Sequence, residues 1–430
     1  MVDDTTDMAT TASARKRPVW VSLVKWIGIV VLGLVALVLL VLFGINTDPG
    51  RRLVADRIGG YTTATGLNIK VGRIDGSLYG RMVLSDLRVS DPTGVFLDSP
   101  RLSVDWRPFA FIRNHVDVRS LEAGAITLRR RPVLKPVPED PNAPLLPDLD
   151  IDVNRLKIGR FIIAAPVTGQ THILSLDGNV HIADRRAQLA ANAVALRGRG
   201  VAGGDRLRLV LDAVPGENKL DLDVKLQAPV GGLVATMGGL KAPLAVTVDG
   251  QGAWSNWRGR GVATLGGGEL ANLTLTTRNG QIAVRGITRP GLYLEGPVER
   301  LTAPGMDVKL DMTLDQRRAD TRMTLRSNAL AIDAGGLIDL AASRFGNFAV
   351  DAKLLTPGAI LPAVRGRDVM ARVVLDGAFA TPTVNYKVTA AALGFNDMGV
   401  EALYAEGLAR VNSDRILVPI KARARRVTGL

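Results

Sequence analysis

The stretch Asp307–Asp315 reads DVKLDMTLD and alternates polar and apolar residues without a break. Successive side chains of a β-strand point to opposite faces, so this stretch predicts a strand with one apolar and one polar face. The pattern returns at 219–227 (KLDLDVKLQ), and 244–248 (LAVTV) is a more apolar version. Strands of this kind indicate an antiparallel sheet with one face in water. The sequence therefore predicts an all-β protein.

An antiparallel sheet has to cover its apolar face. It can fold into a sandwich, close into a small barrel, or curl into a long gutter that receives a greasy ligand. Periodicity alone favours the packed sandwich. Hydrophobic residues make up 47% of the 430 residues but aromatic residues only 4%, and modest aliphatic side chains line a channel without filling it. The composition therefore favours the gutter, and both architectures stay open.

Strand parity selects the apolar residues that would line such a groove. A bulge would move any of them to the other face. The candidates are Leu207, Leu209, Leu220, Leu222, Val224, Leu244, Val246, Val248, Val308, Leu310, Met312 and Leu314.

Turn signals separate the predicted strands. Asn279-Gly280 is typical of a two-residue hairpin turn. An apolar-Asp-Gly motif recurs at 74–76, 176–178, 248–250 and 375–377, where we expect each copy to close a strand. Short helices are expected within 230–240 and 358–364, which Pro or Gly residues bound.

The amino-terminal region contains a membrane-anchor signal. Every residue from Ile27 to Ile45 is apolar or Gly, and this run as a helix would extend about 28 Å, close to the roughly 30 Å of a bilayer's hydrocarbon core. A cleaved signal peptide is the alternative, but its apolar region usually runs only about 7–15 residues. Basic residues at 15–17 and 25 favour a cytoplasmic amino terminus and, in a bacterial cell, a periplasmic bulk. The residues that we expect to contact the membrane in this anchor include Trp26, Ile27, Leu32, Leu37, Leu42 and Ile45.

The chain divides into six predicted sections. Asp48 before Pro49 predicts a helix start with Asp48 as the N-cap, and Val54, Ile58 and Tyr61 follow at helical spacing. The stretch 132–147 holds six of the 22 prolines and predicts an extended loop. The sections are a cytoplasmic segment 1–25, an anchor 26–46, a short amphipathic helix 47–66, a first β section 67–131, a Pro-rich loop 132–147 and an extended β region 148–430.

The sequence offers little for catalysis. It contains no Cys and only three His, with no phosphate-binding loop or zinc-ligand spacing, so we expect no enzyme activity, no cofactor and no metal. A hairpin turning at Asp177-Gly178 would make His172 and His181 diagonal neighbours, and His115 stands alone. All three are expected to be solvated.

The net positive charge raises the question of which anionic partner the protein binds. Lys and Arg number 54 against 41 Asp and Glu, which gives a formal charge of +13. The basic residues are scattered, with small clusters at 129–131 and 423–426 and no interleaved aromatic residues to stack bases. We therefore expect no nucleic-acid binding, and acidic phospholipid headgroups are the nearer anionic partner.

The order of features resembles a known family. After the anchor come GLNI at 66–69, IDGSLYGRMVLSDLRV at 74–89, DPTG at 91–94, LSVDWRP at 102–108, a strand at 121–128, GLKAPL at 239–244 and GQGAW at 250–254. This order is similar to the amino-terminal region of the TamB family, the inner-membrane subunits of bacterial translocation and assembly modules, within the AsmA-like group. The resemblance covers essentially the whole chain, and the order of features carries most of it.

The resemblance implies a fold and two alternative roles. The implied fold is an elongated, curled antiparallel β-sheet that forms a U-shaped apolar groove, with a few short helices. One role is to conduct phospholipid between the inner and outer membranes and so support outer-membrane biogenesis. The other is to scaffold the insertion of outer-membrane proteins and autotransporters. We favour lipid passage, because burying acyl chains is worth about 0.8 kcal/mol per CH₂.

The resemblance also implies a partner, an outer-membrane barrel of the TamA type. Family members are longer and meet that barrel through a distinct carboxy-terminal domain. This chain stops at Leu430, just after a strand-like stretch at 416–420. We therefore expect a fragment, with the barrel contact in a carboxy-terminal region that is absent here.

Overall fold

The computed structural model describes residues 41, 43–135, 150–183, 186–198, 200–214, 218–253, 255–315, 318–340, 342–411 and 416–429. The cytoplasmic segment and most of the expected anchor, with Trp26, Ile27, Leu32, Leu37 and Leu42, lie outside the described residues, and so does most of the Pro-rich loop. Of the anchor candidates, Ile45 is described. Within the described ranges, no helix has both the length and the apolar character needed to span a bilayer.

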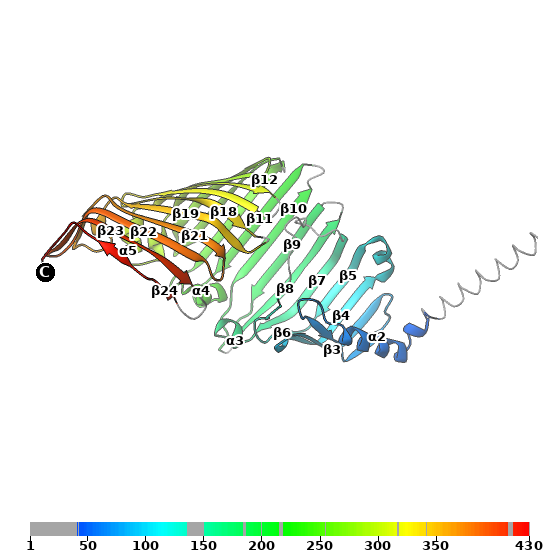
Figure 1. Ribbon diagram of the computed structural model, residues 1–430. Coiled ribbons are helices and arrows are strands. Elements are labelled where there is room, and N and C mark those ends of the chain that lie inside the picture. Colours follow the sequence, from blue (N-terminus) through cyan, green and yellow to red (C-terminus); the bar gives the residue numbers. More distant parts are fainter. Residues whose placement is uncertain are drawn as a thin grey trace, which may run out of the picture.

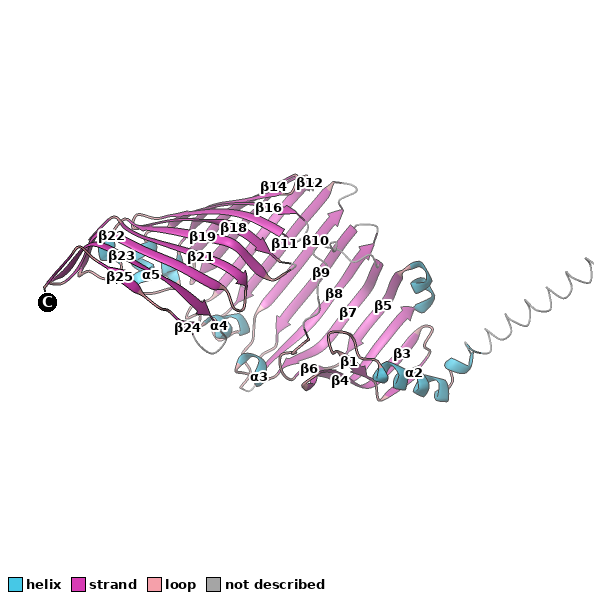
Figure 2. Ribbon diagram, in the orientation of Figure 1, coloured by secondary structure: helices cyan, strands magenta, loops and turns pink. Residues whose placement is uncertain are grey.

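The described residues form one long, curled β-sheet with few helices, as the alternating pattern predicts (Figure 1). Its 26 strands belong to a single sheet, and strands dominate the described residues (Figure 2). Helix α2 lies at one end and β23 to β26 lie at the other. The all-β, curled antiparallel architecture is therefore confirmed.

The strands follow one another along the chain. The first nine are β1 (Asn68–Lys70), β2 (Arg73–Gly76), β3 (Arg81–Asp91), β4 (Gly94–Arg107), β5 (His115–Ala123), β6 (Ile126–Leu128), β7 (Asp150–Ile163), β8 (His172–Ala183) and β9 (Arg186–Ala195). The next ten are β10 (Arg206–Val214), β11 (Lys219–Ala228), β12 (Leu244–Ala253), β13 (Asn256–Leu265), β14 (Gly268–Arg278), β15 (Gln281–Thr288), β16 (Met306–Asp315), β17 (Arg318–Arg326), β18 (Leu330–Asp339) and β19 (Arg344–Leu354). The last are β20 (Val364–Arg367), β21 (Val369–Ala378), β22 (Thr383–Phe395), β23 (Met398–Val411), β24 (Ile416–Leu417), β25 (Lys421–Arg423) and β26 (Arg426–Thr428).

Helix α2 precedes the first strand, and the other helical elements are short and lie between strands. The α-helices are α2 (Asp48–Gly60), α3 (Ala165–Thr168), α4 (Leu233–Gly238) and α5 (Pro297–Thr302), and the 3₁₀ turns are η1 (Pro108–Arg113), η3 (Pro290–Leu292) and η4 (Pro357–Ala359). Helix α4 lies within the stretch 230–240 that was predicted to be helical, and η4 overlaps the start of 358–364.

The strand order is a meander with local breaks. From β7 to β19, each strand pairs antiparallel with the next. In two places, two shorter strands pair with one longer strand. Strands β1 and β2 both pair with β3, and β20 and β21 both pair with β22. Strand β7 pairs in parallel with β5 and β6, and such pairs need a long connection, which the Pro-rich segment supplies. The sheet therefore continues across the Pro-rich segment without interruption.

Two-residue turns close several hairpins. Asn279 and Gly280 have φ of +48° and +80°, the left-handed geometry that matches the twist of the flanking strands β14 and β15. The prediction that each apolar-Asp-Gly motif closes a strand was partly wrong. Leu176-Asp177-Gly178 lies inside β8 and Val248-Asp249-Gly250 lies inside β12, so neither closes a strand.

Helix α2 covers the first strands of the sheet. Thr47, not Asp48, is the N-cap, so Asp48 lies in the first turn beside Pro49. Ala55 is buried and packs with Ile74 and Leu78 of the β2–β3 region. The helix therefore covers one end of the sheet's apolar face, although Ile58 and Tyr61 on the predicted apolar stripe remain exposed.

A second buried cluster lies in the first part of the sheet. Leu102 and Val104 of β4 pack with Ala123 of β5 and Ile158 of β7. These residues come from both sides of the Pro-rich segment. Packing therefore joins the two predicted β sections into one body.

Candidate functional site

One row of apolar residues crosses the sheet from β2 to β25. Each member pairs directly with the next on the neighbouring strand, and each is apolar or Gly. The row is Gly76, Met82, Val104, Leu121, Leu156, Gly178, Ala191, Leu209, Val224, Val248, Gly261, Leu273, Gly286, Val308, Leu325, Ile332, Ala352, Ala371, Val388, Ala405 and Ala422. Strand pairing therefore converts many short alternating patterns into one continuous apolar face.

From β12 to β25, the row one residue away is polar. It lies on the opposite face, because side chains alternate along each strand. From β12 to β25 its members are Asp249, Arg260, Thr274, Arg285, Lys309, Thr324, Asp333, Asp351, Arg372, Lys387, Glu406 and Lys421. The sheet thus separates an apolar face from a charged face over most of its length.

Ion pairs link neighbouring strands on the charged face. Arg326 donates to both carboxylate oxygens of Asp333, at 2.6 and 2.7 Å, and this hydrogen bonding is the main cause that lowers the pKa of Asp333. Arg372 and Asp351 make a similar pair at 3.1 and 3.2 Å. These pairs are largely exposed, so each contributes at most about 1 kcal/mol to stability.

The twelve groove candidates all lie on the apolar face. The pairings Leu209–Val224 and Val224–Val248 join β10, β11 and β12, and the row reaches Val308 of β16 through β13 to β15. Eleven of the twelve are half-buried, and Leu207 is 37% exposed.

The partial burial of this face distinguishes the packed sandwich from the open gutter, the two architectures that the sequence left open. A packed sandwich would bury these side chains against a second sheet, with a core about 10 Å thick. All strands of the described residues belong to the one sheet, so no second sheet covers its apolar face there. The half-burial comes from the neighbouring side chains and the curl of the sheet.

The sequence reasoning missed much of this face. Its prediction covered β10, β11, β12 and β16, whereas the same face extends through Leu176 of β8 and Ala191 of β9 toward Leu325 of β17 and Val388 of β22. The signal was present in β9 (RAQLAANAVA) as Ala and Leu at every second position. Apolar residues also lie on the opposite face of β9, which hid the alternation.

Glycine on the apolar face allows close approach between strands. Gly250 of β12 lies beneath the Trp257 ring of β13, and a Cβ at Gly250 would lie 2.1 Å from that ring. Trp257 is only 4% exposed, which makes it the most buried large side chain on this part of the face. This contact explains why Val248-Asp249-Gly250 continues as strand, since Gly here makes room for an aromatic ring.

The histidines do not form the predicted pair. His172 and His181 lie at opposite ends of the single strand β8, so they are not diagonal neighbours. Instead, His115 Nε2 lies 2.7 Å from Asp152 Oδ2, and His181 Nδ1 contacts Asp152 Oδ1. Sequence reasoning could not find this trio, because it depends on the parallel pairing of β5 with β7. Within the described ranges no group of three or more His, Asp or Glu residues is arranged to hold a metal ion.

His172 differs from the solvated state that was expected. Its side chain is fully buried, and neither ring nitrogen has a hydrogen-bond partner in the described protein. It begins β8 opposite Ile163 of β7. The imidazole therefore acts as a packing element in this position.

An ion pair between the half-buried Arg130 and the buried Asp91 holds the start of the Pro-rich segment. Arg130 donates to both carboxylate oxygens of Asp91, at 2.8 and 2.6 Å, and the Val133 amide donates to the same carboxylate at 2.6 Å. The Arg130 guanidinium is the main cause that holds the pKa of Asp91 well below its usual range. This pair ties residues 130–133 to the β3–β4 turn.

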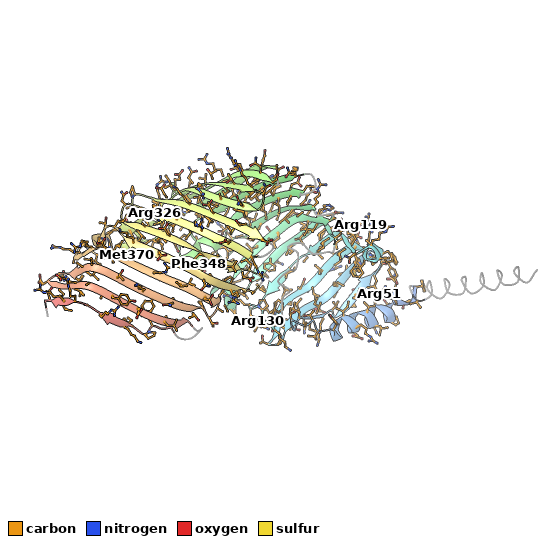
Figure 3. All side chains as sticks on the ribbon, turned by 45° about the horizontal axis from the view of Figure 1, so that its top comes forward. Arg51, Arg119, Arg130, Arg326, Phe348 and Met370 are labelled. Atoms are coloured by element: carbon orange, nitrogen blue, oxygen red, sulfur yellow. The ribbon has the colours of Figure 1, made fainter. Side chains whose placement is uncertain are left out.

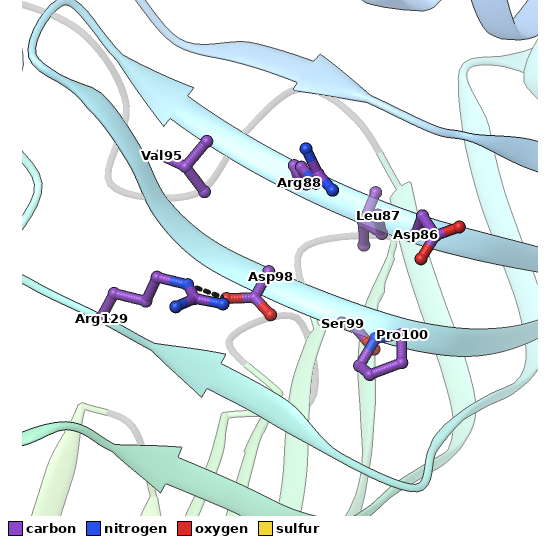
Figure 4. Close-up of a pocket in the computed structure, with 8 residues that line it drawn as sticks. All are labelled: Asp86, Leu87, Arg88, Val95, Asp98, Ser99, Pro100 and Arg129. Atoms are coloured by element: carbon purple, nitrogen blue, oxygen red, sulfur yellow. Dashed lines mark hydrogen bonds and ion pairs between the residues drawn. The ribbon is translucent and has the colours of Figure 1, made fainter.

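A small pocket between β3 and β4 has a volume of about 270 Å³ (Figure 4). Arg129 Nε donates to Asp98 Oδ1 at 2.5 Å, so the two charges at its mouth neutralise each other. Leu87, Val95 and Pro100 supply apolar walls. The apolar face remains the candidate site.

Comparisons with family models, with curated proteins and with solved structures find no match for this chain.

Proposed function

We propose that this chain is an inner-membrane-anchored, periplasmic protein of the TamB type whose apolar face lines a groove that conducts phospholipid between the inner and outer membranes. The observation that carries the proposal is the unbroken apolar row from Gly76 to Ala422. Neighbouring strands lie about 4.8 Å apart, so the row extends over roughly 100 Å. That is several times the roughly 15 Å depth of one leaflet's hydrocarbon. A path of this length suits the passage of lipids in file better than the binding of one molecule.

The energetics support passive conduction. Moving an acyl chain from water to an apolar surface is favourable by about 0.8 kcal/mol per buried CH₂. A charge on the row would interrupt that gain, and none of its members is charged. The polar headgroup can stay in water at the open side of the groove while the tails contact the row.

Site-specific photo-crosslinking in cells tests the proposal. A photo-crosslinking residue at Leu310 faces the apolar side, and one at Lys309 faces the charged side and serves as the matched control. We expect phospholipid to be captured at 310 and not at 309. Equal capture at both positions, or at neither, would contradict lipid conduction. Capture of outer-membrane polypeptides at 310 without phospholipid would favour the scaffold role.

A further inference from the structure

The 3₁₀ turn η1 presents an exposed apolar cluster. Phe109, Phe111 and Ile112 are 53%, 60% and 83% exposed, although they lie next to one another on a six-residue element. Large side chains gathered in this way on a surface mark a contact site for a partner or a membrane. Nothing in the apolar row requires this cluster, because η1 lies beyond the end of β4.

Side-chain contacts place η1 close to the point where the apolar run 27–45 ends. The Leu78 amide donates to Asn46 Oδ1 at 2.9 Å, which ties the residue after that run to the β2–β3 turn. In the same turn, the Tyr79 ring stacks on Phe109 at 5.6 Å between centroids and 17° between planes. Trp106 Nε1 also donates to Leu78 O at 3.0 Å. Asn46, the turn and η1 thus form one connected unit.

Two exposed arginines lie near η1. Arg113 at the end of η1 is exposed and makes no ion pair with any described residue, and exposed Arg81 begins β3 beside the same turn. Arg51 of α2 and Arg119 of β5 lie at the same end of the molecule, but they are already paired with Asp48 and Asp105 (Figure 3). Basic residues near a membrane surface are attracted to anionic headgroups by about 1 kcal/mol each. Aromatic side chains favour the headgroup layer.

We propose that η1 is a second membrane contact that inserts Phe111 and Ile112 into the headgroup layer of an anionic bilayer, beside the anchor. The contact rests on the membrane attachment in the proposed function but not on lipid conduction. It would hold β2 to β4, where the apolar row begins, against the bilayer surface. Lipid packing would be disturbed at the point where a lipid has to leave the leaflet.

Depth-dependent fluorescence quenching tests this contact. The chain has no Cys, so a single Cys can carry an environment-sensitive fluorophore in the full chain, reconstituted in vesicles of phosphatidylcholine and phosphatidylglycerol. Phe43→Cys, at a 76% exposed position within the apolar run, reports the anchor, and Ile420→Cys, 66% exposed near β25, reports the far end. Ile112→Cys reports η1. We expect lipid-attached quenchers to quench the labels on Ile112→Cys and Phe43→Cys, but not the label on Ile420→Cys.

The outcomes separate the two proposals. An unquenched label at 112 with a quenched label at 43 would overturn the contact while the anchor stands. Unquenched labels at both positions would overturn the contact and the anchor together. As a second variant, Arg113→Glu in the Ile112→Cys chain should lower quenching at 112 in phosphatidylglycerol vesicles and leave quenching at 43 unchanged. Unchanged quenching at 112 would count against the role of anionic lipid.

Discussion

Leu310 and Lys309 are neighbours in β16 that face opposite sides of the sheet. Leu310 lies opposite Val284 of β15 and Met323 of β17 on the half-buried apolar face. Lys309 lies opposite Arg285 and Thr324 on the exposed charged face. One step along the chain therefore separates a surface suited to acyl chains from a surface suited to water.

Leu310→Arg should block phospholipid transfer while the protein stays folded. A charge among acyl chains costs about 3 kcal/mol, so we expect transfer to slow by roughly a hundredfold. The open face lets the arginine reach water, so the free energy of unfolding should fall by less than about 1 kcal/mol. Transfer between donor and acceptor vesicles and thermal melts of the full chain measure the two effects. Lys309→Leu is the matched control and should leave transfer unchanged. Unfolding of Leu310→Arg would instead indicate a packed core.

Gly250→Ala should destabilise the sheet where Trp257 crosses it. The new Cβ would lie 2.1 Å from the Trp257 ring, and overpacking of this kind costs about 1–3 kcal/mol of unfolding free energy. Gly261→Ala is the matched control, because its Cβ would lie 3.5 Å from the nearest atom of Leu275. Urea titrations followed by Trp fluorescence compare the two variants. Equal stability of both would contradict the close contact between Trp257 and Gly250.

Asp91→Asn should lower the melting temperature of the full chain at neutral pH. The substitution leaves Arg130 without its carboxylate partner at a buried site. Because the pKa of Asp91 is lowered in the folded protein, its stabilisation is present above the ordinary pKa of about 3.9 and is lost as pH falls below it.

Melting curves of wild type and Asp91→Asn over a range of pH check this expectation. The difference between them should be constant from about pH 5 to 8 and should shrink below about pH 4. Asp75→Asn at the exposed Arg73–Asp75 pair is the control and should change the melting temperature little. A difference that grows toward low pH would contradict the assigned ion pair.

His172→Leu should keep or increase stability. Its imidazole is buried without a partner in the described protein, and an apolar group of similar size avoids the cost of about 1–3 kcal/mol for such a group. His181→Leu is the contrasting variant, since it removes a contact to Asp152 on the half-exposed face. Chemical denaturation of the full chain measures both. A large loss of stability for His172→Leu alone would mean that a polar role at His172 has been overlooked.

The strand type and the side that each residue faces follow from local sequence alone. Alternation in 307–315 and 219–227 fixes which residues share a face, because the side-chain period of a strand is two. Asn279-Gly280 also identified its hairpin, since few other pairs tolerate positive φ at both positions. These features are local, and they follow from a few neighbouring residues.

How far the apolar face continues, and whether another layer packs on it, depends on the tertiary structure. The row from Gly76 to Ala422 depends on the register of every strand pair, including the parallel step from β5 to β7 that no local pattern encodes. The Asp-Gly motifs of β8 and β12 resemble turns locally, yet close approach to neighbouring strands keeps them extended. Alternation is compatible with a sandwich and with an open sheet. The choice between them depends on whether a second layer packs on the face, which is a matter of long-range contacts rather than of sequence period.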